Sequence, residues 1–500
     1  MAPRLPLLLI VAIILFGALA DMNAAAIMDD AYMFVRYADH IAAFGTPSWN
    51  PGGEATYGVT SLLHLLLVFG WRLLLDNPAV AVGMASATAG ILFLVLLAWL
   101  LHRHVALWPS GLPAWIIAYG SLALAIDSFG VHFSTGMDTA TAWAYLTGYM
   151  VVWGWYVRHP SGWSIAGTGM LGGAAFAARP DLLLFSCGLP LARLVLGPER
   201  SDRRSGAGVL LLTGLAAASL ALGAGVVAGS PLPLAFFGKS LRLYGESFYA
   251  QYRLVGIDQS LSFVASFWYL WLLPLADWLL QRRDGQRRPD PTEAGLFAAA
   301  VLFVAYYALF ATQVMPYQQR FLYPVLPALL FVGARASVRL WARLPEGLGS
   351  AHRDAVQRGI AMAVLVGALF PAAVDVARSF SSRQVRGELF DYDLFASYQR
   401  RYTGYWHRLD AVTRLPDDVV VATTEVGLPA AMNPGKTIID LTGLNDTMIA
   451  HRGFSADYVL NTLAPDLIYL PHLHYTRMRR ELMGHPTFGK YEHRGGALLG

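Results

Sequence analysis

The sequence predicts a polytopic α-helical membrane protein with a small α/β domain at its C-terminal end. Of its 500 residues, 56% are hydrophobic and only 14% are charged, whereas soluble domains are about a quarter charged. Apolar runs of membrane-spanning length recur along most of the chain. After residue 378 these runs stop, charges return and short β-like runs appear. The composition therefore excludes a single large soluble domain.

Composition narrows the chemistry further. The single cysteine, Cys187, lies in an apolar run, so neither an internal disulfide nor a cysteine zinc cluster is expected. The net charge of +4 is small, and we expect membrane lipids rather than nucleic acid as partners. Residues 1–20 resemble a signal peptide, but we favour a retained signal anchor because an acidic pair follows at once.

A hydrocarbon core of about 30 Å calls for spans of about 20 apolar residues, and we predict about eleven of them. They lie at 4–20, 79–101, 111–127, 138–157, 163–178, 181–197, 206–229, 261–281, 294–312, 321–341 and 357–378. The two short spans on either side of Arg179 are expected to form a tight hairpin.

The orientation depends on the segment 58–75, which is apolar enough to span but carries polar residues. If it lies along the interface, the basic clusters at 200–204 and 282–288 face the cytoplasm, as the positive-inside rule requires. If it spans, both clusters move outside. We therefore favour an interfacial helix, a cytoplasmic N-terminus and an outer C-terminal region.

That C-terminal region, 379–500, is predicted to be a small mixed α/β domain. Its short β-like runs are Val419–Ala422, Thr437–Leu441 and Leu467–Leu470. A polar turn, Gly443 to Asp446, follows the second run. We predict a boundary between a membrane domain, 1–378, and this outer domain.

An acidic pair, Asp29 and Asp30, directly follows the first predicted span. It opens a segment, Asp29–Gly45, whose apolar positions have helical spacing, so we expect an amphipathic helix lying on the membrane. N-capping is the simpler explanation for an Asp at such a position. Capping needs one acid, however, and leaves the second unexplained.

Further polar residues fall on the same predicted outer side. They are Arg36, Tyr57, Thr60, Asp138, Arg179, Asp181, Lys239 and Arg320. Taken singly, the basic residues could be snorkelling to the headgroups, and Asp138 could be another N-cap. Their joint placement beside the acidic pair favours a reaction site.

These residue types suit the transfer of a group from a phosphate carrier to a hydroxyl. Arginine and lysine bind phosphate by charge-assisted hydrogen bonds, and a carboxylate can take the proton of an attacking hydroxyl. A divalent cation, Ca²⁺ or Mg²⁺, could be held by Asp30 and Asp138. Apolar surroundings suggest a lipid-linked carrier.

Several motifs resemble the GT-C glycosyltransferases similar to the mycobacterial terminal arabinofuranosyltransferase. They are Asp29-Asp30-Ala31-Tyr32, Arg36-Tyr37-Ala38, Asn50 to Glu54, Tyr57 to Ser61, Ser134 to Thr139, Arg179-Pro180-Asp181, Met315-Pro316, Arg320-Phe321-Leu322, Asp440-Leu441 and Gly443 to Asp446. The chain departs from the family pattern in two ways. It has Ala55 and Thr56 before Tyr57-Gly58, without the Glu expected there, and it carries Asp138 where many relatives have Glu.

The resemblance implies a multi-span GT-C fold in the bacterial inner membrane with a periplasmic active site. It implies inverting transfer of a sugar, arabinofuranose in this family, from a polyprenyl-phosphate donor to a hydroxyl of a cell-envelope glycan or glycoprotein. The proposed base of the family matches Asp29 or Asp30. We favour Asp29 as the base, with Asp30 orienting the acceptor or capping the helix.

By position, Lys239, Arg320 and Arg179 are the candidates for donor phosphate. Arg36, Tyr57, Thr60, Asp138 and Asp181 are the candidates for sugar contacts. Two alternatives stay open: a hexose donor or protein acceptor, and a transporter of anionic lipids. Transporters usually show paired halves and broken mid-membrane helices, which the sequence does not show.

Overall fold

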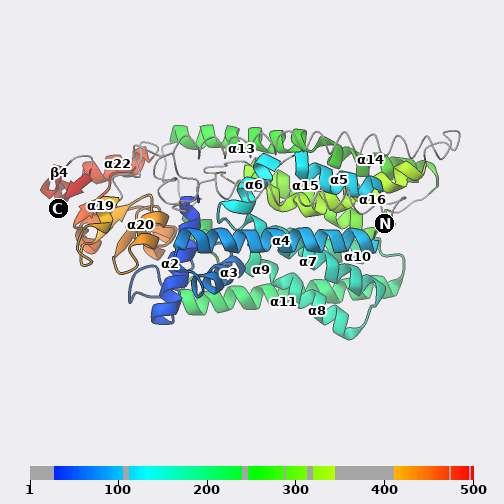
Figure 1. Cartoon of the computed structure of the whole chain (residues 1–500), viewed down its shortest axis with the longest axis horizontal. Coiled ribbons are helices and arrows are strands. Elements are labelled where there is room, and N and C mark those ends of the chain that lie inside the picture. The colour runs from blue at the N-terminus through cyan, green and yellow to red at the C-terminus, as the bar shows by residue number, and fades with distance from the viewer. Residues whose placement is uncertain are drawn as a thin grey trace, which may run out of the picture.

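The computed structural model describes residues 27–104, 112–124, 126–238, 246–285, 289–311, 313, 319–343, 410–471, 475–494 and 497–499. The molecule is elongated: long helices run along its main axis, and the C-terminal domain lies at one end (Figure 1). The helix α2 crosses the bundle beside that domain (Figure 1). The predicted spans 4–20 and 357–378, the N-terminal anchor, Lys239 and the boundary near 379 lie outside the described residues.

Each predicted span within the described part coincides with helical structure. The α-helices are α4 (Pro78–His104), α5 (Leu112–Leu124), α6 (Ile126–Ser134), α7 (Thr139–Arg158), α8 (Gly162–Gly173), α9 (Ala175–Ala178), α10 (Leu183–Leu196), α11 (Arg200–Ala228), α12 (Leu234–Gly238), α13 (Glu246–Ser266), α14 (Trp268–Arg283), α15 (Pro291–Leu309) and α16 (Leu326–Ala342). Short 3-10 turns, η1 (Pro180–Leu182) and η3 (Tyr323–Val325), precede α10 and α16. Among the described helices, 4 are long and apolar enough to cross a membrane, or up to 5 if a bent pair counts as one span.

The bent pair corrects one sequence expectation. The span predicted at 261–281 is divided between α13 and α14, which meet at an angle of 64°. The break falls at Phe267, whose ring packs against Phe263 and Tyr323. No glycine or proline lies at this position to indicate a bend, so hydropathy predicted one continuous span.

The segment 58–75 contains only α3 (Leu62–Arg72). Its 11 residues extend about 16 Å, which is too short for a core of about 30 Å. Leu65 and Val68 are buried against α2 and α4, whereas Leu66 is 64% exposed. This length and this one-sided burial support the interfacial helix that the charge pattern favoured.

The helix α2 (Asp29–Phe44) ends at Gly45, as predicted, but its polar face is covered. Ala31 and Val35 pack in one cluster with residues of α3 and α4. Arg36 and His40 lie opposite the apolar positions of the helix, and both are buried beneath the C-terminal domain. Both sides of α2 are therefore buried, the apolar side against α3 and α4 and the polar side against the C-terminal domain.

The C-terminal domain contains a 5-stranded sheet of order β2-β1-β3-β5-β4. The strands are β1 (Val421–Thr423), β2 (Ile438–Asp440), β3 (Leu467–Ile468), β4 (Glu492–Arg494) and β5 (Ala497–Leu499). The first three match the predicted runs and are parallel, while β4 and β5 were not predicted. The helices are α19 (Asp410–Thr413), α20 (Gly427–Met432), α21 (Thr447–Arg452) and α22 (Thr476–Met483), with the further turns η5 (Tyr458–Leu463) and η6 (Pro486–Lys490).

Candidate active site

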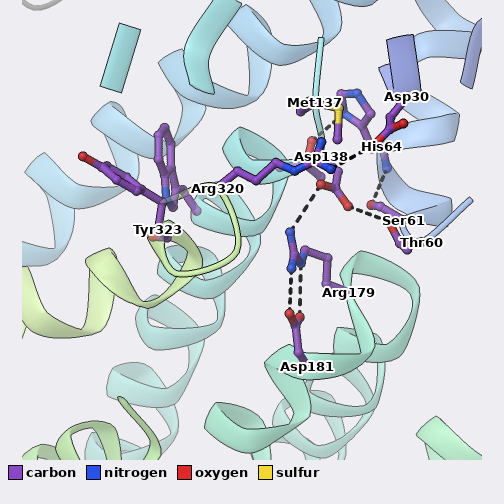
Figure 2. Close-up of polar contacts among 12 residues, drawn as sticks. Asp30, Thr60, Ser61, His64, Met137, Asp138, Arg179, Asp181, Arg320 and Tyr323 are labelled. Carbon is purple, nitrogen blue, oxygen red and sulfur yellow. Dashed lines mark hydrogen bonds and ion pairs between the residues drawn. The ribbon is translucent and has the colours of Figure 1, made fainter. Parts of the chain in front are cut away.

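The candidate site lies where the start of α2 meets the loop before α7. The backbone N–H of Met28 donates to the carbonyl of Thr135 over 3.2 Å, and the buried His64 bridges Gly136 and Thr141. These contacts hold the loop that carries Asp138 on the same side of the site as Asp30 (Figure 2). Residues more than 100 positions apart in the sequence thus converge at one end of the bundle.

Arg179 forms the centre of a buried ion-pair network. It lies between Asp138 and Asp181 (Figure 2), with nitrogen–oxygen distances of 3.4 and 2.7 Å. Thr60 donates to the other oxygen of Asp138 over 3.0 Å. Tyr307 donates to Asp181 over 2.7 Å and accepts a hydrogen bond from Arg179. Two carboxylates therefore already balance the guanidinium charge.

Asp138 occupies the N-cap position of α7, yet its side chain forms no capping hydrogen bond. Both of its oxygens are used by Thr60 and Arg179 instead. The simpler explanation of Asp138 as a helix cap is therefore wrong. Its carboxylate connects the segment before α3 to the turn between α9 and α10.

Arg320 is paired less completely. Its Nη2 donates to Asp30 Oδ2 over 3.0 Å, and its Nη1 reaches only the sulfur of Met28 at 3.7 Å. Its Nε is buried without a partner in the described structure. The side chain of Arg320 is 7% exposed, whereas that of Asp30 is 38% exposed. The preceding Gln319 has a φ of 57°, which a non-glycine residue adopts only where its surroundings hold it.

Asp29 does not cap its own helix. Its two carboxylate oxygens accept backbone hydrogen bonds from Gly427 over 3.0 Å and Leu428 over 2.7 Å. Burial is the largest cause that raises the pKa of Asp29 to about 7, and the charge of Asp30 adds to it. The two amides oppose this rise without cancelling it. Asp29 can therefore gain and lose a proton near neutral pH.

A third acid, Glu425, belongs to the same electrostatic cluster. Burial, together with the charges of Asp29 and Asp30, raises its pKa to about 8. Sequence analysis missed Glu425 because it lies about 400 positions from the acidic pair. Its place three residues after a predicted strand was the available signal, since loops at the carboxyl ends of parallel strands often form sites.

Asp440, part of a family-like motif, shapes a loop rather than the reaction centre. Its oxygens accept hydrogen bonds from Thr442 and Asn445, and burial raises its pKa to about 6. Asn445 in turn accepts a hydrogen bond from Tyr37 of α2 over 3.0 Å. A Cβ at Gly58 would lie 2.1 Å from Asn445 Oδ1, so this approach requires glycine. The loop after Asp440 thus packs the C-terminal domain against the segment that leads into α3.

Two of the candidates for sugar contacts, Arg36 and Tyr57, are buried, and in the described structure neither is hydrogen-bonded to the ion pairs above. Arg36 is fully buried, and its guanidinium donates to the carbonyls of Trp49, Ala430, Asn433 and Lys436 at 2.7–2.8 Å. This geometry favours a role in fixing the C-terminal domain over sugar binding. Tyr57 is 3% exposed, and its hydroxyl has no partner in the described part of the chain.

No metal site is evident in the residues that the structure describes. No group of three or more His, Cys, Asp or Glu side chains there is arranged to hold an ion. Asp30 is paired with Arg320, and Asp138 with Arg179 and Thr60. A divalent cation at these acids stays a prediction from the sequence.

Together, these features define a polytopic helical membrane protein with a polar site beneath a C-terminal α/β domain. No protein-family model matches the sequence, and neither does any curated protein. Among solved structures, the chain is similar to the crystal structure of ArnT from Cupriavidus metallidurans bound to undecaprenyl phosphate. The TM-score is 0.52 at 12% identity, over 93% of this chain and 96% of that one. The chain therefore has the membrane-protein fold of that structure.

Proposed function

We propose that this protein is an inverting glycosyltransferase that uses a polyprenyl-phosphate sugar donor. The observation that carries the proposal is the buried, unpaired Nε of Arg320, whose guanidinium contacts Asp30. The residue before Asp30 is Asp29, whose pKa burial raises to about 7. It is supported by the ArnT-like fold, because that structure holds undecaprenyl phosphate. The motif resemblance favours arabinofuranose as the sugar and a cell-envelope glycan as the acceptor. It also favours the inner membrane, with the site facing the periplasm.

In the proposed reaction, an acceptor hydroxyl oxygen forms a bond to the anomeric carbon of the donor. The bond between that carbon and the phosphate oxygen breaks, and its electron pair leaves with the polyprenyl phosphate. Asp29 takes the hydroxyl proton, as its raised pKa allows at neutral pH. Inversion follows because attack and departure occur on opposite faces of the sugar.

Arg320 is the strongest phosphate candidate, since the departing phosphate gains one negative charge and preorganised donors stabilise such charge. Asp30 accepts one hydrogen bond from this guanidinium, through Nη2. Arg179 is a weaker candidate than the sequence suggested, because Asp138 and Asp181 already neutralise it. We assign it to shaping the wall of the site. Lys239 stays a candidate from the sequence alone.

The test is to incubate the purified protein with a panel of polyprenyl-phosphate pentoses and hexoses and an octyl glycoside acceptor. We expect release of polyprenyl phosphate and an octyl disaccharide from at least one donor, with arabinofuranose first. A hexose product would keep the reaction class and change the sugar. If no donor releases polyprenyl phosphate, the glycosyltransferase hypothesis is wrong. Movement of anionic lipid across the membrane of proteoliposomes would then favour the transporter hypothesis.

A further inference from the structure

The C-terminal domain places a ligand-binding edge of its sheet against the acidic pair. The strand β1 is parallel to β2 on one side and to β3 on the other. After β1 the chain forms β2 on one side of it and later forms β3 on the other side. Parallel sheets bind ligands in the crevice beyond the carboxyl end of such a switch strand. That end of β1 leads directly into Glu425 and α20.

The contact with α2 is close enough to fix this edge. The amides of Gly427 and Leu428 hold Asp29, and a Cβ at Gly427 would lie 1.9 Å from the carbonyl oxygen of Asp29. Arg36 and Trp49 add hydrogen bonds to the carbonyls of Lys436 and Ile438. The loop that carries Glu425 is thus built onto the first residue of α2.

Polar groups at this edge lack protein partners. Glu425 uses only its backbone in hydrogen bonds, with Thr423, and no hydrogen bond or ion pair holds its carboxyl group in the described structure. The adjacent Thr424 is 6% exposed, and its buried hydroxyl has no partner there either. Across the acidic pair, Nε of Arg320 is also unpaired. The Thr424 hydroxyl and the Arg320 Nε are thus buried without partners among the described residues, and Glu425 is half-buried. A ligand with several hydroxyl groups would supply partners for these groups.

We propose that Glu425 binds the acceptor sugar, so that the C-terminal domain supplies the acceptor subsite of the enzyme. The chemical class is a polyhydroxylated glycoside, because a carboxyl group without protein partners can hydrogen-bond sugar hydroxyls. Asp29 then meets the attacking hydroxyl, while Arg320 holds the donor phosphate on the other side of Asp30. Burial keeps Glu425 protonated at neutral pH, so it can donate as well as accept.

This inference rests on the proposed function, and its test separates the two. Wild type, Glu425→Ala and Asp457→Asn are assayed for transfer to an octyl arabinofuranoside and for hydrolysis of the same donor without acceptor. Asp457 is a matched control, an acid of the same domain whose side chain is 74% exposed. Thermal unfolding of all three proteins shows whether they fold alike.

We expect Glu425→Ala to raise the KM for the octyl glycoside about tenfold, as for one lost hydrogen bond to a sugar hydroxyl. Donor hydrolysis should stay at the wild-type rate, and Asp457→Asn should change neither reaction. Equal loss of transfer and hydrolysis, or an unchanged KM, would overturn the role of Glu425. If wild type neither transfers nor hydrolyses any donor, the proposed function itself fails.

Discussion

Arginine–carboxylate clusters lie near both ends of α16, and they differ in how fully the arginine is paired. At the far end, Arg339 donates from Nε to Asp277 and from Nη1 to Glu293, each over 2.8 Å, and Nη2 also reaches Glu293. Before the near end, Arg320 has one carboxylate and leaves Nε unpaired. Complete pairing stabilises a helix contact, whereas incomplete pairing keeps donors ready for another anion.

The largest effect should follow from removing the proposed base. We expect Asp29→Asn to lower kcat by about 10²–10⁴-fold, because the amide cannot take the acceptor proton. Binding of polyprenyl phosphate should persist, since Arg320 is untouched. Steady-state transfer assays and lipid-phosphate titration measure the two quantities.

The matched control for this variant is Asp277→Asn, a buried acid of the other cluster with a side chain 2% exposed. It should lower the unfolding temperature and leave kcat of the folded protein unchanged. Transfer by Asp29→Asn at the wild-type rate would remove Asp29 from the mechanism.

A second prediction compares the two arginines directly. Arg320→Gln should weaken polyprenyl phosphate binding about 10–100-fold, as for one charge-assisted hydrogen bond. Arg339→Gln should leave that affinity unchanged and destabilise the fold by about 2 kcal/mol, less than for a fully buried pair because Arg339 is 30% exposed. Titration with polyprenyl phosphate and thermal unfolding distinguish these results. A loss of affinity in both variants would mean that the clusters do not differ in function.

The pH dependence provides a third prediction. A carboxylate base works when deprotonated, and burial raises the pKa of Asp29 to about 7. The value of kcat/KM should therefore be lost as the pH falls below about 7, by about tenfold per unit. Above about pH 8 it should fall again as Glu425 loses its proton. In Glu425→Gln the alkaline decline should disappear, and a profile flat from pH 5 to 9 in the wild type would contradict both assignments.

Local structure followed closely from the sequence, because hydropathy and strand-like runs are local properties. The ends of α4 and α7 lie within three residues of the predicted spans, and β1 to β3 match their runs. The bend at Phe267 was not predictable, since it depends on packing against Tyr323, about 56 residues later in the chain. Periodicity correctly gave a helix at α2 but not what covers its polar face.

The site was predicted in part for the same reason. Threading the spans by hydropathy and loop charge places Thr60, Asp138, Arg179 and Asp181 on one side, and the four residues do converge. It cannot separate an arginine that binds anions from one that binds backbone carbonyls, so Arg36 was placed in the sugar site. Pairing across the chain makes that distinction, and the same long separation concealed Glu425.

The smallest effect is expected from a change in the contact between the C-terminal domain and the segment before α3. In Gly58→Ala, the new methyl group would lie 2.1 Å from Asn445 Oδ1 and 2.3 Å from the Tyr37 hydroxyl. We expect a loss of about 1–3 kcal/mol in stability, typical of overpacking, and a modest rise in acceptor KM as the domain shifts. Gly70→Ala is the control, because nothing lies within 4 Å of its Cβ position in α3. That change should be neutral or stabilising. If Gly58→Ala unfolds at the wild-type temperature and keeps the wild-type KM for the acceptor, the loop after Asp440 does not hold the C-terminal domain in place.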